Sequence, residues 1–159
     1  MKLSFVNSEM GEIAKYFIQK GEKTAIISRG YGGKLNNKEV HVVSDGINLY
    51  HTAEEAGDEP YWLAVNLDGC AVLTCSSRYK AAKYAIENLG IKKIILDDGF
   101  QHRKLYRDLN IVLIDSEKMF GNENGFRTSL FVNCVKNKME SILILLNQRS
   151  TLVFERLIE

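Results

Sequence analysis

The sequence predicts an α/β protein with a mostly parallel sheet, flanking helices and a β-hairpin insertion. Three observations predict this class. Short, unbroken apolar runs alternate along the chain with segments of helical periodicity, as strands and helices do in parallel α/β sheets. Glycines and acidic residues bound the apolar runs. Hydrophobic residues make up 45% of the 159 positions and charged residues 26%, which is the composition of an ordinary globular protein.

The individual elements follow from apolar spacing and from punctuating residues. The predicted strands, which share unbroken apolar sequence, are 24–28, 71–75, 93–97 and 110–115. The predicted helices are 8–20, 60–67 and 78–89. Asn7 or Ser8 is the expected N-cap of the first helix, Pro60 is the expected start of the second, and Gly90 closes the third. Residues 40–50 predict the hairpin, because Asp45-Gly46 separates two segments with alternating apolar residues.

Beyond about residue 119 the sequence has weaker periodicity. Residues 121–125 predict a loop, and residues 141–146 are compatible with a strand. Residues 151–158 are compatible with either a strand or a short helix.

Overall composition excludes several classes of function. With 21 basic and 20 acidic side chains, the net charge of +1 gives no general attraction to nucleic acid or to anionic membranes. No apolar run reaches the length of a membrane span. The three cysteines, Cys70, Cys75 and Cys134, form no CxxC pair, which is typical of reduced thiols in a cytosolic protein.

The first candidate motif, Ser28-Arg-Gly-Tyr-Gly-Gly33, follows a predicted strand. Ligands of open parallel sheets bind beyond the carboxyl ends of the strands. The glycines would allow close approach of the backbone, and Arg29 could bind a phosphate group. The alternative interpretation is a flexible turn between a strand and a hairpin.

The second candidate motif, Gly57-Asp-Glu-Pro60, places two carboxylates at the start of a predicted helix. Asp58 and Glu59 would lie near the positive end of the helix dipole, which favours their ionised forms. They could bind a divalent cation or accept a proton. An acidic N-cap with a solvated neighbour is the alternative interpretation.

The third candidate motif, Ile94-Ile-Leu-Asp-Asp-Gly-Phe-Gln-His102, is an apolar strand that ends in acid. This is the form of a Walker B strand, whose carboxylate reaches the magnesium ion beside a nucleotide. Asp97, Asp98 and His102 are its candidate functional residues, and a turn with a capping histidine is the alternative. Asp115 ends the next predicted strand in a similar way and is interpreted as structural.

A Walker A loop, with the pattern GxxxxGK[ST], does not occur in the sequence. Gly30-Tyr-Gly-Gly-Lys34 is superficially similar, but its first glycine is too near the lysine. Leu35 stands where the hydroxyl residue would be.

Taken together, the three motifs and Arg107-Asp-Leu-Asn-Ile111 closely resemble tetraacyldisaccharide 4'-kinase, the lipid A 4'-kinase of Gram-negative bacteria. The resemblance covers about residues 10–125, and its most specific part is the segment DDGFQHRKL. It implies a P-loop fold, ATP with Mg²⁺, and phosphoryl transfer to the 4'-hydroxyl of a lipid A disaccharide precursor. Such enzymes work at the cytoplasmic face of the inner membrane.

The resemblance also implies roles for individual residues. Asp58 resembles the catalytic base for the sugar hydroxyl. The acids on the magnesium side of the site would be Glu59, Asp97 and Asp98. The residues that would line the same site, near substrate or phosphate, are Arg29, Tyr31 and His102.

Compared with the family pattern, we expect this chain to lack the membrane-contacting first segment, the Walker A loop and the C-terminal lobe. We therefore expect an incomplete P-loop kinase-like domain over residues 1–126. Residues 127–159 would be a divergent tail, which we interpret as out-of-frame translation. Two alternatives stay open: a non-catalytic remnant or small binding module without ATP, and a metal-dependent hydrolase that uses the same acids.

Overall fold

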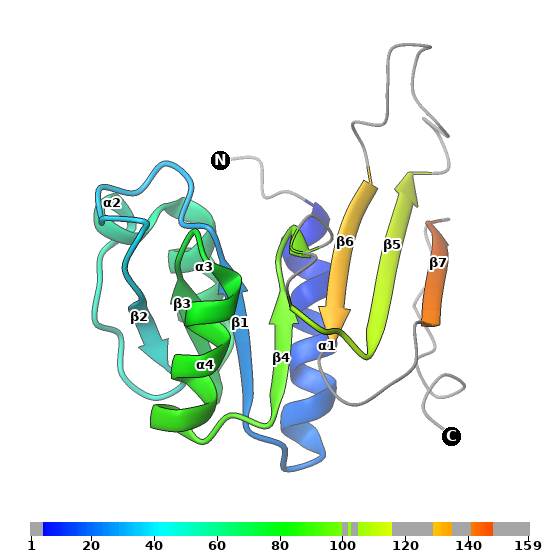
Figure 1. The fold of residues 1–159 in the computed structure, drawn as a ribbon, viewed down its shortest axis with the longest axis horizontal. Helices are drawn as coiled ribbons and strands as arrows, with labels where there is room; N and C mark the ends of the chain where they lie inside the picture. Colours follow the sequence, from blue (N-terminus) through cyan, green and yellow to red (C-terminus); the bar gives the residue numbers. More distant parts are fainter. Residues whose placement is uncertain (1–4, 100–101, 103–104, 116–128, 135–140, 148–159) are drawn as a thin grey trace.

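The computed structural model describes residues 5–99, 102, 105–115, 129–134 and 141–147. Within these residues a seven-stranded sheet runs in the order β2-β3-β1-β4-β6-β5-β7 (Figure 1). Its strands are β1 (Thr24–Ser28), β2 (His41–Asp45), β3 (Cys70–Thr74), β4 (Lys93–Leu96), β5 (Leu109–Asp115), β6 (Ser129–Cys134) and β7 (Ser141–Asn147). The helices are α1 (Phe5–Gln19), α2 (Ala53–Ala56), α3 (Asp58–Asn66) and α4 (Arg78–Leu89). None of the helices in these ranges has the length and apolar character that crossing a membrane requires.

The centre of the sheet is parallel, as the sequence predicts. β1 lies between β3 and β4, and Thr24 stands opposite Cys70 on one side and Lys93 on the other. Further strands join antiparallel to this core: β2 pairs with β3, and β6 pairs with β4. β6 was not predicted from the sequence, and it comes from the segment 127–159, as does β7. The division of the chain at residue 126 stays a prediction.

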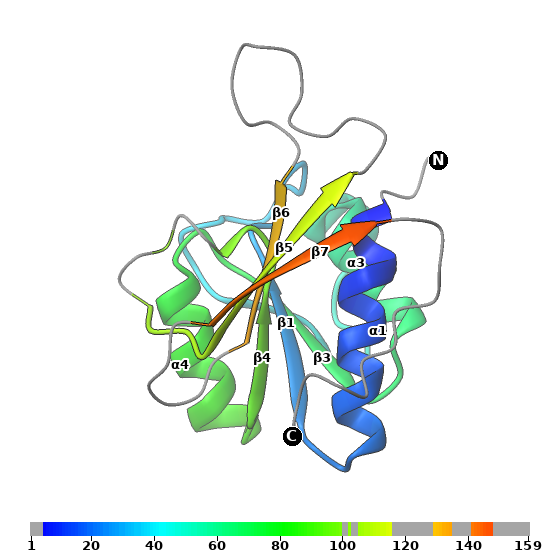
Figure 2. The ribbon, with the colours of Figure 1, turned by 90° about the vertical axis from the view of Figure 1, so that its right-hand side faces the viewer.

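Helices cover both faces of the parallel core (Figure 2). Successive side chains of a strand point to opposite faces, so each strand contributes to two apolar clusters. Ile26 and Val72 pack with α1 and α3 residues in one cluster. Ile27 and Leu73 pack on the opposite face with the buried alanines of α4. The strands therefore have apolar residues at every position, because both of their faces are covered.

Two helices begin earlier than their sequences suggest. α1 begins at Phe5, so the predicted N-cap at Asn7 or Ser8 is wrong. α3 begins at Asp58, not Pro60, because the Tyr61 N–H donates to the Gly57 carbonyl and closes an earlier first turn. Both acids of the second motif thus belong to the first turn of α3. α4 has the predicted bounds.

The predicted hairpin is present with a very short return arm. β2 runs into a turn in which the Asp45 carboxylate accepts hydrogen bonds from the N–H groups of Ile47 and Asn48. The chain returns through a single bridge between Ser44 and Leu49. The predicted loop at 121–125 and the segment 151–158 lie outside the described residues.

Candidate functional site

The carboxyl ends of β1 and β4 meet at one edge of the sheet. The Asp97 N–H donates to the Ile27 carbonyl at 3.0 Å, which continues the ladder one residue past β4. The Ser28 Oγ donates to Asp97 Oδ2 at 3.1 Å. β1 has a neighbouring strand on each side, β3 and β4. The helices that lead into these two strands, α3 and α4, lie on opposite faces of the sheet. Ligands of open α/β sheets bind at such a point.

Three carboxylates from two distant parts of the chain, Glu59 and the pair Asp97 and Asp98, lie within electrostatic reach of one another here. The pKa of Asp97 is raised to about 6, first by burial and then by the neighbouring charges of Asp98 and Glu59. Glu59 comes from the first turn of α3, so folding brings the second and third motifs together. Asp98 is exposed and adopts a φ of +49°, a left-handed conformation that aspartate tolerates better than most residues.

Positive groups lie on the same side of the molecule, and Arg78 is close enough to Asp97 and Asp98 for their charges to interact. Burial lowers the pKa of His102, and the nearby guanidinium groups of Arg78, Arg29 and Arg107 lower it further. Arg107 Nη1 donates to the carbonyls of Gly99 and His102, at 2.8 and 3.3 Å, and so holds the turn after β4. Arg29 and His102 therefore lie near Arg78, whose guanidinium also interacts with the charges of Asp97 and Asp98.

Arg78 is the residue that sequence reasoning missed. It opens α4, and only 1% of its surface is exposed, although it carries a charge. Its guanidinium donates to the main-chain carbonyl of Asp97. A lone arginine before an alanine-rich helix carries no signal of burial in the sequence. The serine cap at Ser77 marks the helix start but not the contact with β4.

The glycine-rich loop packs directly against the segment that leads into α3. A β-carbon on Gly33 would lie 2.4 Å from the Glu55 carbonyl oxygen, and one on Gly57 would lie 2.7 Å from the Tyr31 carbonyl oxygen. Only glycine allows main chains this close. The first and second motifs are thus joined backbone to backbone, next to Asp58.

The side chains of Tyr31 and Asp58 themselves point to solvent: Tyr31 is 88% exposed, and Asp58 is exposed at the first position of α3. Their assignment as substrate-side and catalytic residues stays a prediction. Of the segment DDGFQHRKL, Phe100, Gln101, Arg103 and Lys104 lie outside the described residues.

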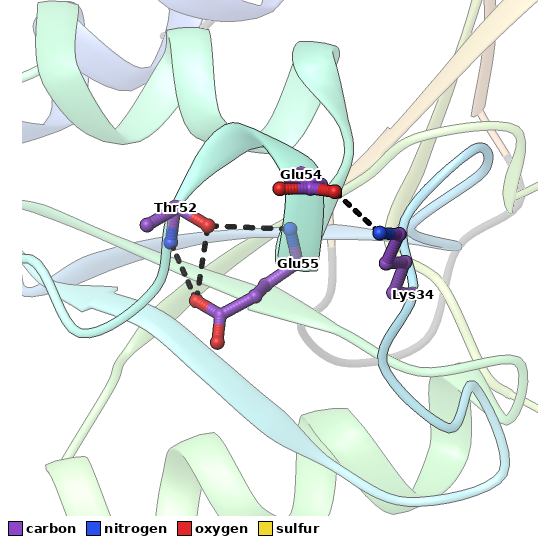
Figure 3. Close-up of polar contacts among 4 residues, drawn as sticks. All are labelled: Lys34, Thr52, Glu54 and Glu55. Atoms are coloured by element: carbon purple, nitrogen blue, oxygen red, sulfur yellow. Dashed lines mark hydrogen bonds and ion pairs between the residues drawn. The ribbon is translucent and has the colours of Figure 1, made fainter.

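The short helix α2 supports the glycine loop (Figure 3). Thr52 and Glu55 form a capping box, in which each side chain bonds the other residue's main-chain N–H. The Lys34 ammonium pairs with the Glu54 carboxylate across an exposed surface, and the Lys34 N–H donates to the Glu54 carbonyl at 3.2 Å. The lysine that follows the glycines is therefore engaged with α2.

The carboxylates at this edge of the sheet fit a magnesium ion that is held together with a phosphate-bearing substrate. In the part of the chain that the structure describes, no three His, Cys, Asp or Glu side chains form a ready-made metal cage. Mg²⁺ usually keeps several waters and binds through one or two carboxylates together with substrate phosphates. Burial and the charges of Asp98 and Glu59 raise the pKa of Asp97, and a divalent cation would relieve that repulsion.

A parallel α/β core that gathers carboxylates and guanidinium groups at the ends of its strands defines the class: an α/β protein of the P-loop kinase type. The family is then given by comparison with known sequences. The family model described as tetraacyldisaccharide-1-P 4'-kinase matches residues 10–126, and the chain belongs to this family.

Individual relatives agree with this family. The chain is 49% identical over 114 residues to the tetraacyldisaccharide 4'-kinase of Desulfotalea psychrophila, covering 72% of this chain and 32% of that protein. It is 46% identical over 110 residues to that of Syntrophus aciditrophicus, covering 69% of this chain and 29% of that protein. A crystal structure of LpxK from Aquifex aeolicus in complex with ATP aligns with a TM-score of 0.64 and 42% identity, covering 74% of this chain and 36% of that one. The chain thus spans about a third of the length of these relatives.

Proposed function

We propose that this chain acts as a tetraacyldisaccharide 4'-kinase, which transfers the γ-phosphate of ATP to the 4'-hydroxyl of a lipid A disaccharide precursor. Family membership and the ATP complex of the Aquifex relative support this reaction. The observation that carries the proposal is the strand edge itself. There, Ser28 holds Asp97 by a hydrogen bond, and Glu59 and Asp98 lie close enough to raise the pKa of Asp97.

Each group has a defined part in this reaction. The Asp58 carboxylate accepts the proton of the 4'-hydroxyl while that oxygen bonds to the γ-phosphorus and ADP leaves. Glu59, Asp97 and Asp98 are the acids on the Mg²⁺ side, and one or two of them would hold the ion together with the phosphates, whose charge it would neutralise. Arg29 balances further phosphate charge.

Tyr31 and His102 complete the substrate and phosphate side of the proposed site. Burial and then the nearby guanidinium groups lower the pKa of His102, which favours its neutral form. A neutral imidazole can donate one hydrogen bond and accept another.

The lipid acceptor sets the place of the reaction. Its acyl chains keep it in a bilayer, so we propose that the chain works at the cytoplasmic face of the bacterial inner membrane. Fractionation of cells that express the chain tests this location. Recovery from membranes only when the disaccharide lipid is present would support it, whereas recovery in the soluble fraction in both cases would contradict it.

The kinase proposal is tested by ATP-dependent phosphorylation of the disaccharide lipid with purified protein. Asp58→Ala should lower the rate by at least about a hundredfold, the usual contribution of a general base. Asp68→Ala, which removes another exposed aspartate in the turn just after α3, is the matched control and should leave the rate unchanged. Equal, nonzero rates in the wild type and Asp58→Ala would remove Asp58 from this role.

A second candidate function, a binding module that holds no ATP, is favoured by the sequence after the glycines. Leu35 replaces the hydroxyl residue of a phosphate loop, and Lys34 is paired with Glu54. A thermal melt with and without Mg²⁺-ATP separates the two candidates. Ligand at about a hundred times its Kd stabilises a protein by about 2.7 kcal/mol, so a kinase should melt several degrees higher. An unchanged melting temperature at millimolar ATP would favour the binding module.

A further inference from the structure

Arg78 joins the ends of two strands through a single guanidinium group. Its Nη1 donates to the Cys75 carbonyl at 2.8 Å, just beyond β3. Its Nε and Nη2 donate to the Asp97 carbonyl at 3.3 and 3.0 Å, just beyond β4. The planar fork of arginine makes this double contact possible, and lysine has no equivalent geometry.

The position of this arginine is unfavourable by itself. The group is almost completely buried, and burial lowers the pKa of Arg78. It also lies in the first turn of α4, where the helix dipole disfavours a positive charge. A buried charge is often no more stable than an apolar side chain of the same size. The stability of the fold alone therefore does not explain an arginine at this position.

The contact completes the fixation of Asp97. The Asp97 N–H is bound to the Ile27 carbonyl, its Oδ2 accepts from Ser28, and its carbonyl accepts from Arg78. The main chain is thus held on both sides of the α-carbon. Asp98, the next residue, is the first one free to turn outward to solvent.

We propose that Arg78 is a positioning residue of this site: by holding the Asp97 carbonyl to the end of β3, it aims the Asp97 and Asp98 carboxylates at a divalent cation. This role rests on the proposed function, because it assumes that the acids hold a cation. In the proposed role, Arg78 makes no contact with the cation or the nucleotide. It acts on the cation only through the backbone of the turn, as residues behind metal ligands do.

Two variants of the full chain test this role. Arg78→Lys keeps the charge but loses the fork, and Arg78→Ala leaves a space that methylguanidinium can enter. Ser77→Ala is the matched control, because it removes the N-cap of the same helix while the guanidinium remains. Mn²⁺ is the probe, with binding in the presence of ATP followed by electron paramagnetic resonance of the free ion.

We expect Arg78→Lys and Arg78→Ala to bind Mn²⁺ at least about tenfold more weakly than the wild type, as loss of a group behind a metal ligand does. Ser77→Ala should stay within about twofold of the wild type, because its helix is merely less stable. Methylguanidinium should restore binding to Arg78→Ala and leave the other proteins unchanged. If Arg78 were merely structural, its substitution would weaken Mn²⁺ binding only in proportion to the drop in melting temperature, as Ser77→Ala does.

Hydrogen exchange of the Asp97 amide gives an independent readout. Arg78→Lys should exchange this amide faster than the wild type, because its hydrogen bond to Ile27 loses a neighbouring anchor. Wild-type Mn²⁺ affinity in Arg78→Lys would overturn the positioning role and leave the proposed function intact. Failure of the wild type itself to bind Mn²⁺ with ATP would instead overturn the proposed function and this role with it.

Discussion

Gly33 and Gly57 lie in direct main-chain contact: a β-carbon built on Gly33 would stand 2.8 Å from the nitrogen of Gly57. This contact joins the glycine-rich loop after β1 to the segment that begins α3. The loop carries Arg29 and Tyr31, and α3 carries Asp58 and Glu59. The spacing between the two motifs on the folded protein therefore depends on the absence of side chains at two positions.

The first prediction concerns this contact. Gly33→Ala would place its β-carbon 2.4 Å from the Glu55 carbonyl oxygen, which belongs to rigid main chain. We expect it to lower the free energy of unfolding by about 1–3 kcal/mol, as overpacking does. Gly32→Ala is the control: its φ of +81° is strained, but no atom lies within 4 Å. Urea unfolding of both variants checks the ranking, and an equal or smaller loss in Gly33→Ala would contradict it.

The second prediction concerns pH. Burial, with the charges of Asp98 and Glu59, raises the pKa of Asp97 to about 6 from its ordinary 3.8. The folded protein thus binds this proton more tightly than the unfolded chain does. The stabilising contribution of protonated Asp97 is complete below about pH 4 and is lost as the pH rises through about 6.

Asp97→Asn removes this loss of stability at higher pH, because asparagine does not ionise. It keeps a side-chain oxygen that can accept from Ser28. At about pH 7.5 without divalent cations, it should raise the free energy of unfolding by on the order of 2 kcal/mol. Below about pH 4 the gain should vanish. Urea unfolding across this range measures the difference, and a variant less stable than the wild type at neutral pH would refute the assignment. The same substitution should weaken Mn²⁺ binding, since stability and function conflict at this position.

The third prediction concerns the capping box of α2. Thr52→Ala removes the side chain that accepts from the Glu55 N–H and should lower the free energy of unfolding by about 1 kcal/mol. Glu54→Gln, which breaks the exposed ion pair with Lys34, should cost less than half as much. Thermal unfolding compares the two variants. A larger effect of Glu54→Gln would mean that the ion pair, not the cap, holds the glycine loop.

The fourth prediction concerns the thiols of β3 and its end. Cys70 and Cys75 are fully buried, and burial raises the pKa of Cys70 to about 12. Because the thiolate is the reactive form, Cys70 should resist iodoacetamide at about pH 8 in the native chain and react after unfolding in urea. Peptide mass spectrometry measures the modified fraction. Rapid labelling of native Cys70 would contradict the buried environment.

The sequence was sufficient to predict the parallel core. Each of its strands is apolar throughout because both faces of the sheet are covered, so short apolar runs located β1, β3 and β4. The α4 bounds were predictable because Ser77 and Gly90 are strong capping signals. The starts of α1 and α3 were placed too late, since helix ends depend on main-chain hydrogen bonds as well as on residue type. α2 is too short for any periodicity, and β6 lies where the sequence pattern is weak.

The candidate site was predictable only in part, for a similar reason. That acids at the end of β4 and at the start of α3 come together follows from the rule that strand ends share an edge. The burial of Arg78 does not follow from any rule about sequence. It depends on the spacing of two carbonyls, Cys75 and Asp97, that are set by different strands. The role of Asp58 stays a prediction, because its side chain is exposed at the helix start.

The central place of β1 in the sheet has a consequence for folding kinetics. Of its two partners, β3 is synthesised only after α2 and α3, and β4 only after α4 as well. A growing chain on the ribosome therefore holds an apolar strand with both edges unpaired until residue 74 has emerged, and with one edge unpaired until residue 96 has emerged. Such distant pairings slow folding and favour wrong association between chains. The middle of this molecule should thus be among the last parts to become protected after synthesis.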